Sequence, residues 1–354
     1  MGFEIHVASN MFGVDWLKDD GSLDYLDIIK HQIDFGRTPL SFGNIKALMQ
    51  LKKLLKKEHY DLIHCHTPIA AALIRIAANK YRKRGNLKVI YTSHGFHFHK
   101  HSSKKSWLIY HTLEKRLAPK TDMIITINRE DLEVVKNFSV KEKRYIPGVG
   151  IDINKIESAK GDENSLRQEL NIPLDSFVIM SIGELSERKN QIAIIKALSK
   201  MEFQDIYYLL CGTGTKEKEL KKLVKKLELG ERVLFLGHRD HDWVMSLAHE
   251  IDVGAIPSKI EGLGLAGLEM MAAGKPIIGS CIHGINDYVI NGVTGFSCYP
   301  DDIDGFAKSI GILYKDRELR AQMGQAAKEK ASEFDINIVH DLMTDNYRYI
   351  LNSD

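Results

Sequence analysis

The sequence has few cysteines and no long apolar segment. Its four cysteines among 354 residues are widely scattered and form no C-x-x-C pair. This excludes a disulfide-stabilised scaffold and makes a structural zinc site unexpected. No apolar run approaches the ~20 residues needed to span a bilayer, and no signal-peptide pattern is recognisable. We therefore expect reduced cysteines and a cytoplasmic location.

Acidic residues are scarce in the first half of the chain. Residues 1–150 contain 25 Lys and Arg against 15 Asp and Glu, whereas the remainder contains 24 against 32. This asymmetry indicates that the first half meets something anionic. Within residues 51–60, Leu51, Leu54 and Leu55 share one helical face among four lysines, a pattern typical of helices on anionic membrane surfaces. Nucleic acid is not expected as a partner, because no nucleic-acid-binding module accompanies the charge.

Short apolar segments alternate with helical patterns along the whole chain. This alternation predicts an α/β protein with parallel sheets covered by helices on both faces. The polar segment 148–176 lacks the strand pattern and indicates a domain boundary. We predict two doubly wound, Rossmann-like domains, residues 1–150 and 151–335, with a ligand cleft between them at the strand C-terminal ends. Residues 336–354 are predicted to form a terminal helix that packs back toward the first domain.

The expected elements follow from the two periodicities. The predicted strands cover residues 3–8, 61–65, 88–93, 122–127, 143–147, 177–183, 206–212, 232–237, 252–257 and 276–280. The predicted helices lie near residues 43–57, 68–83, 103–117, 129–137, 189–200, 215–228, 241–248, 264–273, 303–314 and 316–333.

The most informative stretch is "EGLGLAGLE", residues 261–269. The helix predicted to start near Leu263–Leu265 leaves its first backbone N–H groups without intrahelical partners, and glycines there let a ligand approach the backbone. Such a helix start favours an anion, for example a phosphate. Glu269, one turn inside, can accept hydrogen bonds from the vicinal hydroxyls of a ribose or hexose.

Two other interpretations of this stretch remain open. Its glycines also match the G-x-G-x-x-G fingerprint of dinucleotide-binding oxidoreductases. That motif belongs directly after the first strand of its domain, whereas here it lies late in the chain and "SKIE" follows the strand end. Alternatively, the glycines only permit tight packing of a helix on a strand.

Other candidate residues follow predicted strand ends. Gly183 ends a strand, and Arg188 and Lys189 are predicted at the start of the next helix, where cations oppose the helix dipole unless they face an anion. A diphosphate would explain both cations. His94 ends a strand of the first half and could donate to a hydroxyl or transfer a proton.

Histidines gather in two places in the first half. His94, His97, His99 and His101 suggest a metal, but no acidic partner completes a ligand set, so we predict no metal site. The pair His64 and His66 ends another strand, and we interpret it as structural or cleft-lining.

Five segments together resemble the retaining glycosyltransferases of family 4, which have the GT-B fold. They are "PSKIEGLGLAGLEMMAAGKPIIGS", which matches the E-x7-E donor loop, "GELSERKNQ", "SHGFHF", "DLIHCHTP" and "HGINDYVINGVTGF". The similarity covers nearly the whole chain and is nearest to the bacterial branch that builds capsule, exopolysaccharide or related surface glycans.

The resemblance implies a reaction and a set of roles. A sugar would pass from a nucleotide-diphosphate sugar, with UDP favoured, to a saccharide or lipid-linked acceptor at the cytoplasmic membrane face, with retention and without a metal or cofactor. Glu261 would contact the donor sugar, Glu269 the ribose, and Arg188 and Lys189 the leaving diphosphate, while His94 would lie beside the transferred sugar. The other implied donor-binding positions are Gly183, Gly262, Leu263, Gly264 and Leu265.

The beginning of the chain departs from the family pattern. The N-terminal domain of the family normally starts with a strand, a glycine-containing loop and a helix, but "MGFEIHVAS" resembles the second strand. We therefore expect the first βα unit to be missing. This leaves two alternatives to an active transferase: an impaired homologue that still binds nucleotide, and, more remotely, an NAD-dependent oxidoreductase. Asp287 falls where the family has an acidic residue, and we assign it no role.

Overall fold

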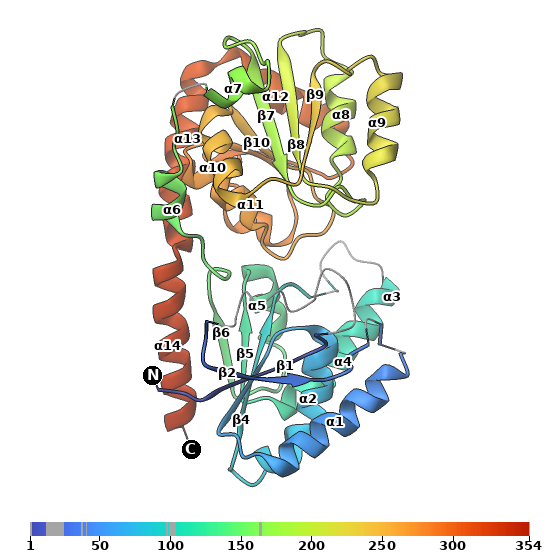
Figure 1. Cartoon of the computed structure of the whole chain (residues 1–354), viewed down its shortest axis with the longest axis vertical. Coiled ribbons are helices and arrows are strands. Elements are labelled where there is room, and N and C mark those ends of the chain that lie inside the picture. The colour runs from blue at the N-terminus through green and yellow to red at the C-terminus, as the bar shows by residue number, and fades with distance from the viewer. Residues whose placement is uncertain are drawn as a thin grey trace.

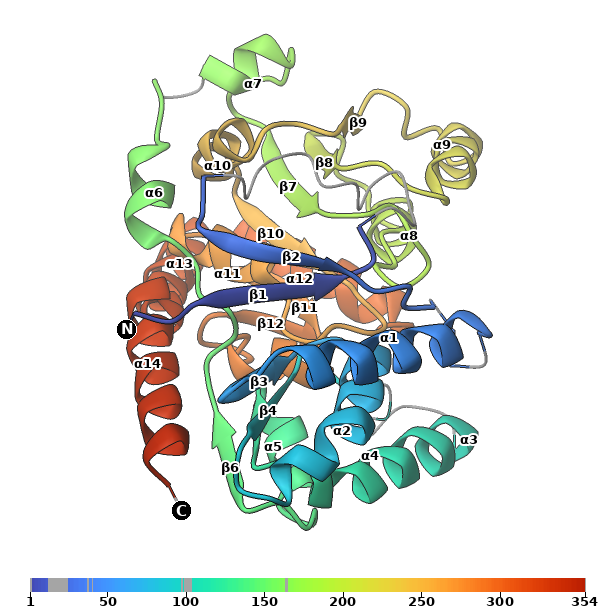
Figure 2. The same ribbon diagram turned by 60° about the horizontal axis from the view of Figure 1, so that its bottom comes forward.

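The chain forms two α/β domains stacked along one axis (Figure 1). The computed structural model describes residues 2–11, 25–36, 38–39, 41–96, 98, 104–162 and 165–353. A parallel β-sheet lies at the centre of each domain, and helices pack against it (Figure 2). The predicted fold class, two Rossmann-like domains of the GT-B type, is confirmed.

The N-terminal domain contains two parallel sheets within the described residues. β1 (Ile5–Ser9) pairs with β2 (Ile28–Gln32), and a separate sheet has the order β3 (Leu62–Cys65), β4 (Lys88–Ser93), β5 (Met123–Thr126) and β6 (Glu142–Tyr145). The helical segments are α1 (Gly43–Lys57), α2 (Pro68–Arg82), α3 (Lys104–Ser106), η2 (Trp107–His111), α4 (Thr112–Leu117), η3 (Ala118–Lys120) and α5 (Arg129–Val135). The expectation of a missing first βα unit remains a prediction.

The C-terminal domain is a doubly wound sheet. Its strand order is β12 (Gly295–Cys298), β11 (Ile277–Ser280), β10 (Val253–Ile256), β7 (Phe177–Ile182), β8 (Ile206–Cys211) and β9 (Val233–Gly237). The helical segments are α6 (Ile153–Ser158), α7 (Ser165–Glu169), α8 (Ile192–Leu198), α9 (Glu217–Lys226), α10 (His241–Glu250), α11 (Leu265–Ala272), η4 (His283–Asp287), α12 (Ile303–Lys315), α13 (Arg317–Ala331) and η5 (Ser332–Phe334). The order reverses between β7 and β10, so the loops that follow these strands flank the crevice where such sheets bind ligands.

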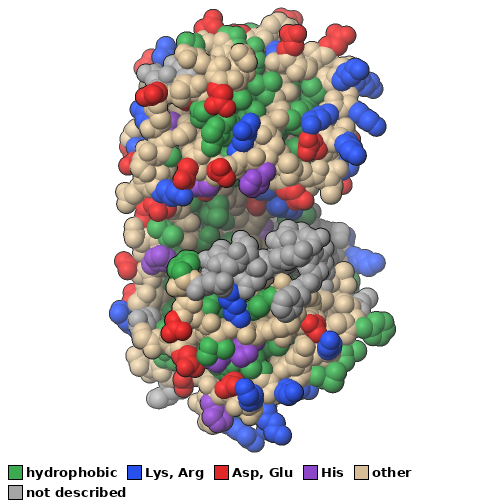
Figure 3. Space-filling view, viewed as in Figure 1, with side chains coloured by type: hydrophobic (Ala, Val, Ile, Leu, Met, Phe, Trp, Pro, Cys, Tyr) green, Lys and Arg blue, Asp and Glu red, His purple; other side chains and the backbone are tan. Residues whose placement is uncertain are grey.

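A final helix, α14 (Ile336–Asn352), returns along the N-terminal domain (Figure 1). The Tyr347 hydroxyl lies 2.7 Å from His64 Nδ1, and Tyr349 donates to Glu142 at 2.8 Å. The two segments that cross between the domains also touch, because the Ile151 amide donates to the Phe334 carbonyl at 2.9 Å. The space-filling surface is hollowed at the level where the domains meet (Figure 3).

The leucine face of α1 is not a membrane surface. Leu51 is 2% exposed and Leu55 is 4% exposed, because both pack into the core of the N-terminal domain. The expectation that this face lies on lipid is therefore wrong, because the lysines flank a face that is buried inside the protein. Among the described residues, no helix is both long and apolar enough to cross a bilayer.

Candidate functional site

The loop after β10 leads into α11 through a left-handed glycine. Gly264 has φ 88° and is the N-cap residue, so α11 begins at Leu265 without a side-chain cap. A side chain at Gly264 would be strained by this φ. The third amide of α11, at Gly267, donates to the Gly264 carbonyl at 2.9 Å, so the first two amides are the ones that can meet a ligand, and the helix dipole favours an anionic one.

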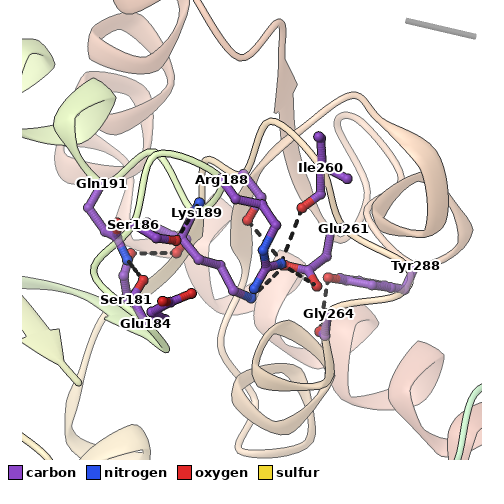
Figure 4. A network of polar contacts seen from close by, with 12 residues as sticks. Ser181, Glu184, Ser186, Arg188, Lys189, Gln191, Ile260, Glu261, Gly264 and Tyr288 are labelled. Atoms are coloured by element: carbon purple, nitrogen blue, oxygen red, sulfur yellow. Dashed lines mark hydrogen bonds and ion pairs between the residues drawn. The ribbon is translucent and has the colours of Figure 1, made fainter. Parts of the chain in front are cut away.

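Glu261 lies between two cations that come from the turn after β7 (Figure 4). Lys189 Nζ is 2.5 Å from Glu261 Oε2, and Arg188 Nη1 is 3.5 Å from both carboxylate oxygens. Ser258 also donates to Glu261, at 3.3 Å. Glu261 is 8% exposed, so a carboxylate that burial would disfavour is held by charge and hydrogen bonds. The structure thus brings together three of the predicted catalytic residues.

The local structure around the cations differs from the prediction. Arg188 and Lys189 lie in a turn, and α8 begins only at Ile192. Asn190 adopts φ 56°, a left-handed conformation that interrupts a helix, and its side chain donates to the Pro257 carbonyl at 2.9 Å. The helix-dipole argument for the two cations is therefore wrong, although their convergence on Glu261 is real.

Gly183 makes room for the lysine. Its φ is 133°, and a Cβ added there would lie 3.3 Å from Lys189 Cε. A larger side chain at position 183 would therefore push Lys189 away from Glu261. Gly183 supports the cation by leaving space rather than by contributing a chemical group.

Glu269 lies one turn inside α11 and has a partner that the sequence reasoning did not select. His241 Nε2, at the start of α10, is 2.9 Å from Glu269 Oε1. The Glu269 side chain is 18% exposed, so its carboxylate is still accessible. The only sequence signal for His241 was its place at the predicted helix start after β9.

Leu263 contributes to the domain contact through its side chain. It is 4% exposed, and a Cβ added to Gly148 of the N-terminal domain would lie 2.3 Å from Leu263 Cδ2. The Leu265 side chain is half-buried beside the C-terminal core. These two side chains serve packing, and the donor contact implied for both residues stays a prediction.

His94 meets the glutamate loop from the opposite domain. A Cβ added to Gly262 would lie 2.0 Å from the His94 carbonyl oxygen, so the two backbones are in direct contact. His94 keeps part of its surface open to solvent, and its Nε2 lies 3.1 Å from His66 Nδ1. Burial lowers the pKa of His94 below its usual value. His97, His99 and His101 lie outside the described residues.

Asp287 also joins the domains. Its Oδ2 accepts a hydrogen bond from the Arg129 amide at 2.9 Å. Burial raises the pKa of Asp287 to about 6, although Arg129 opposes this shift. Within the described parts of the chain, no three His, Cys, Asp or Glu side chains are grouped as metal ligands.

Comparisons with known proteins agree with this architecture. Residues 162–330 match the profile of "Glycosyl transferases group 1", and residues 1–128 match "Glycosyl transferase 4-like". The chain is 33% identical to the putative glycosyltransferase EpsD of Bacillus subtilis over 100% of its own length and 91% of that relative.

A second relative and a solved structure extend the comparison. The chain is 31% identical to the UDP-Gal:alpha-D-GlcNAc-diphosphoundecaprenol alpha-1,3-galactosyltransferase of Escherichia coli, over 83% of this chain and 76% of the relative. Anabaena HepE, solved with UDP and glucose, superposes with a TM-score of 0.78 at 24% identity, over 97% of this chain and 91% of HepE. The chain therefore belongs to the group 1 and family 4-like glycosyltransferases and is a transferase of GT-B fold.

Proposed function

We propose that the protein transfers a sugar from a UDP-sugar to a saccharide or lipid-linked acceptor in surface polysaccharide assembly, with retention of configuration. The main observation behind this proposal is that Lys189 and Arg188 both contact Glu261, beside the start of α11, which has no side-chain cap. The relative from Escherichia coli uses UDP-Gal and a diphosphoundecaprenol-linked acceptor by its name. HepE has been solved with UDP-glucose.

In this proposal the C-terminal domain binds the donor. The diphosphate lies at the start of α11, where unpaired amides stabilise its charge. Lys189 and Arg188 neutralise the negative charge that develops as the bond to the sugar breaks, so no metal or cofactor is needed for that task. Glu269 accepts hydrogen bonds from the ribose hydroxyls, and His241 fixes the orientation of its carboxylate.

The N-terminal domain then presents the acceptor. Glu261 orients the donor sugar, and His94 lies across the cleft beside it. The acceptor hydroxyl attacks from the face that the diphosphate leaves, forming the new C–O bond as the old one breaks. The leaving phosphate oxygen takes the hydroxyl proton. This same-face route requires no second carboxylate acting as a nucleophile, unlike a double displacement.

Calorimetry and UDP release test this proposal. Wild-type protein should bind UDP and release it from at least one of UDP-glucose, UDP-galactose and UDP-N-acetylglucosamine. Glu269→Ala and Arg188→Ala should each weaken UDP binding by about 10- to 100-fold, because hydrogen bonds to charged groups contribute about 1.5–3 kcal/mol. Arg317→Ala and Glu318→Ala, on the exposed face of α13, are matched controls. Unchanged UDP affinity in both site variants would overturn the assignment.

A second candidate is a chain that binds nucleotide without transfer. The N-terminal domain must hold the acceptor, and its described strands form two separate sheets. This division of the sheet motivates the second candidate. UDP binding with wild-type affinity but no UDP release in the presence of any donor and lipid-linked acceptor would favour this candidate.

We further propose that the protein works peripherally at the inner face of the cytoplasmic membrane. Phe42, Ile45 and Met49 form an exposed apolar row along α1, with exposures of 88%, 60% and 61%. The helix carries five lysines and no acidic residue. Exposed apolar side chains beside lysines suit the interface of an anionic bilayer.

A further inference from the structure

One buried histidine of the C-terminal domain is paired with the N-terminal domain. His283 Nε2, in η4, is 2.8 Å from Asp131 Oδ1, in α5. The two side chains are 1% and 0% exposed. An ion pair so well shielded from water is costly to break, because either partner alone would be a buried charge.

The same imidazole also touches the glutamate loop. The Glu261 backbone lies close enough to His283 to raise the pKa of the ring. A Cβ added to Gly95, at the end of β4, would lie 3.5 Å from His283 Cε1. His283 has φ 43°, a left-handed conformation that is unfavourable for a residue with a side chain. The ring thus contacts α5, the end of β4 and the Glu261 loop at once.

These contacts favour a positively charged ring. A carboxylate 2.8 Å from Nε2, with the Glu261 backbone nearby, favours the form of the ring that carries both protons. Burial alone would lower the pKa of His283, but the hydrogen bond and charge of Asp131, the charge of Glu130 and the Glu261 contact raise it overall. Asp287 on η4 also interacts with this charge, and Arg129 of α5 acts on Asp287 in the same direction as His283 does.

Asp131 anchors a wider contact around the loop. Its second oxygen accepts from the Phe96 amide at 3.0 Å and from Asn128 Nδ2 at 3.1 Å. Asn128 Nδ2 also donates to the Gly262 carbonyl at 3.1 Å. A Cβ added to Gly284 would lie 2.1 Å from that same carbonyl oxygen. Gly262 therefore has no room to move while the domains are in contact.

We propose that His283, as an imidazolium that bridges the domains through Asp131, is a positioning residue that holds Glu261 and Gly262 in register with His94 across the cleft. This inference rests on the proposed function. The UDP-binding groups Lys189, Arg188 and Glu269 all belong to the C-terminal domain, so we expect them to keep their places without the bridge. The bridge therefore serves transfer and not nucleotide binding.

The test separates UDP affinity from turnover in the full-length chain. In His283→Ala, the dissociation constant for UDP should stay within about twofold of wild type, while kcat for UDP release should fall at least tenfold. Wild-type kcat should decline as pH rises through the raised pKa of His283, and His283→Ala should lack this decline. Asp131→Asn keeps the shape of the side chain but removes the charge that raises the pKa of His283. The decline of kcat in this variant should therefore begin at a lower pH than in the wild type. His249→Ala is the matched control, because that ring contacts the Ile156 carbonyl at 2.8 Å within one domain.

Two results would overturn the inference. The first is that His283→Ala has the same kcat as the wild type and the same decline of kcat with rising pH. The other is a loss of UDP affinity as large as the loss of kcat. If the wild type neither binds UDP nor releases it, the proposed function itself fails. In that case, amide hydrogen exchange of residues 258–264 tests the bridge on its own. Faster exchange in His283→Ala than in His249→Ala supports the bridge, and equal exchange contradicts it.

Discussion

Arg75 and Glu114 form a second buried ion pair, but this one lies inside a single domain. Arg75 Nη1 is 2.9 Å from Glu114 Oε2, and the two side chains are 0% and 7% exposed. The guanidinium also lies 4.3 Å from the centre of the Tyr91 ring. Its role is therefore structural, in contrast to the pair between His283 and Asp131, which spans the cleft.

Glu114→Gln should strongly destabilise the N-terminal domain. The substitution leaves the Arg75 charge buried without a full counter-charge, and breaking such a pair costs about 3–5 kcal/mol. Urea unfolding followed by tryptophan fluorescence measures the loss. Glu133→Gln removes the exposed partner of Lys136 and should leave the midpoint unchanged, because exposed pairs contribute little. Equal midpoints for both variants would contradict this reading.

At the residue scale, the sequence alone predicted those site residues that lie within or next to a recognisable motif. Glu261 was predicted because glycines follow it directly, and Arg188 and Lys189 because they lie in the short segment after the strand that ends at Gly183. His241 and His283 were not, because their partners Glu269 and Asp131 lie 28 and 152 positions away. A histidine acquires such a role only through tertiary contact, which no local pattern contains.

Elements were predicted best where they are buried and regular. α1 and β4 have the predicted bounds, 43–57 and 88–93. β2 was missed because "IIKHQ" carries three polar side chains in a row. α6 was missed inside the polar segment 148–176, although Asp152 caps it by accepting from the Lys155 amide at 2.9 Å. The predicted helix 103–117 contains a π-helical turn, η2, within which Trp107 stacks on His111 at 4.2 Å.

The exposed row on α1 gives a prediction at the scale of one element. Replacing Phe42, Ile45 and Met49 together by Ser should weaken binding to anionic liposomes by at least tenfold, since each side chain loses about 1.5–3 kcal/mol of apolar burial. A sedimentation assay with phosphatidylglycerol vesicles at low salt measures this. Ser substitutions at Ile338 and Leu342, exposed on α14, are the matched control. If the wild-type protein does not bind these vesicles at low salt, the membrane proposal is wrong.

Asp287 makes the stability of the whole molecule depend on pH. Its pKa is raised from 3.8 to about 6 in the folded chain, so the folded state holds a proton that the unfolded state has already lost. Its stabilising contribution is present below pH 3.8 and is lost as pH rises through about 6. Above that range, the buried carboxylate at the domain contact destabilises the fold.

Asp287→Asn should therefore stabilise the protein at pH 8 by roughly 1–3 kcal/mol, at about 1.4 kcal/mol per pKa unit, and leave it unchanged at pH 4. The amide oxygen can still accept from the Arg129 backbone. Thermal unfolding of both proteins at the two pH values measures the difference. A variant less stable than wild type at pH 8 would show that the carboxylate is held by charge rather than disfavoured by burial.

The two crossings between the domains lie side by side, and this determines how the cleft can open. The Ile151 amide donates to Phe334, and the Ile336 amide donates to Ile151, both at 2.9 Å. Gly150 has φ 85°, and a Cβ there would lie 2.5 Å from Ile336 Cα. Both strands of the connection must therefore turn about the same short axis. With one pivot, opening is a rotation about the region of residue 151, so interdomain distances far from this residue change more than those close to it.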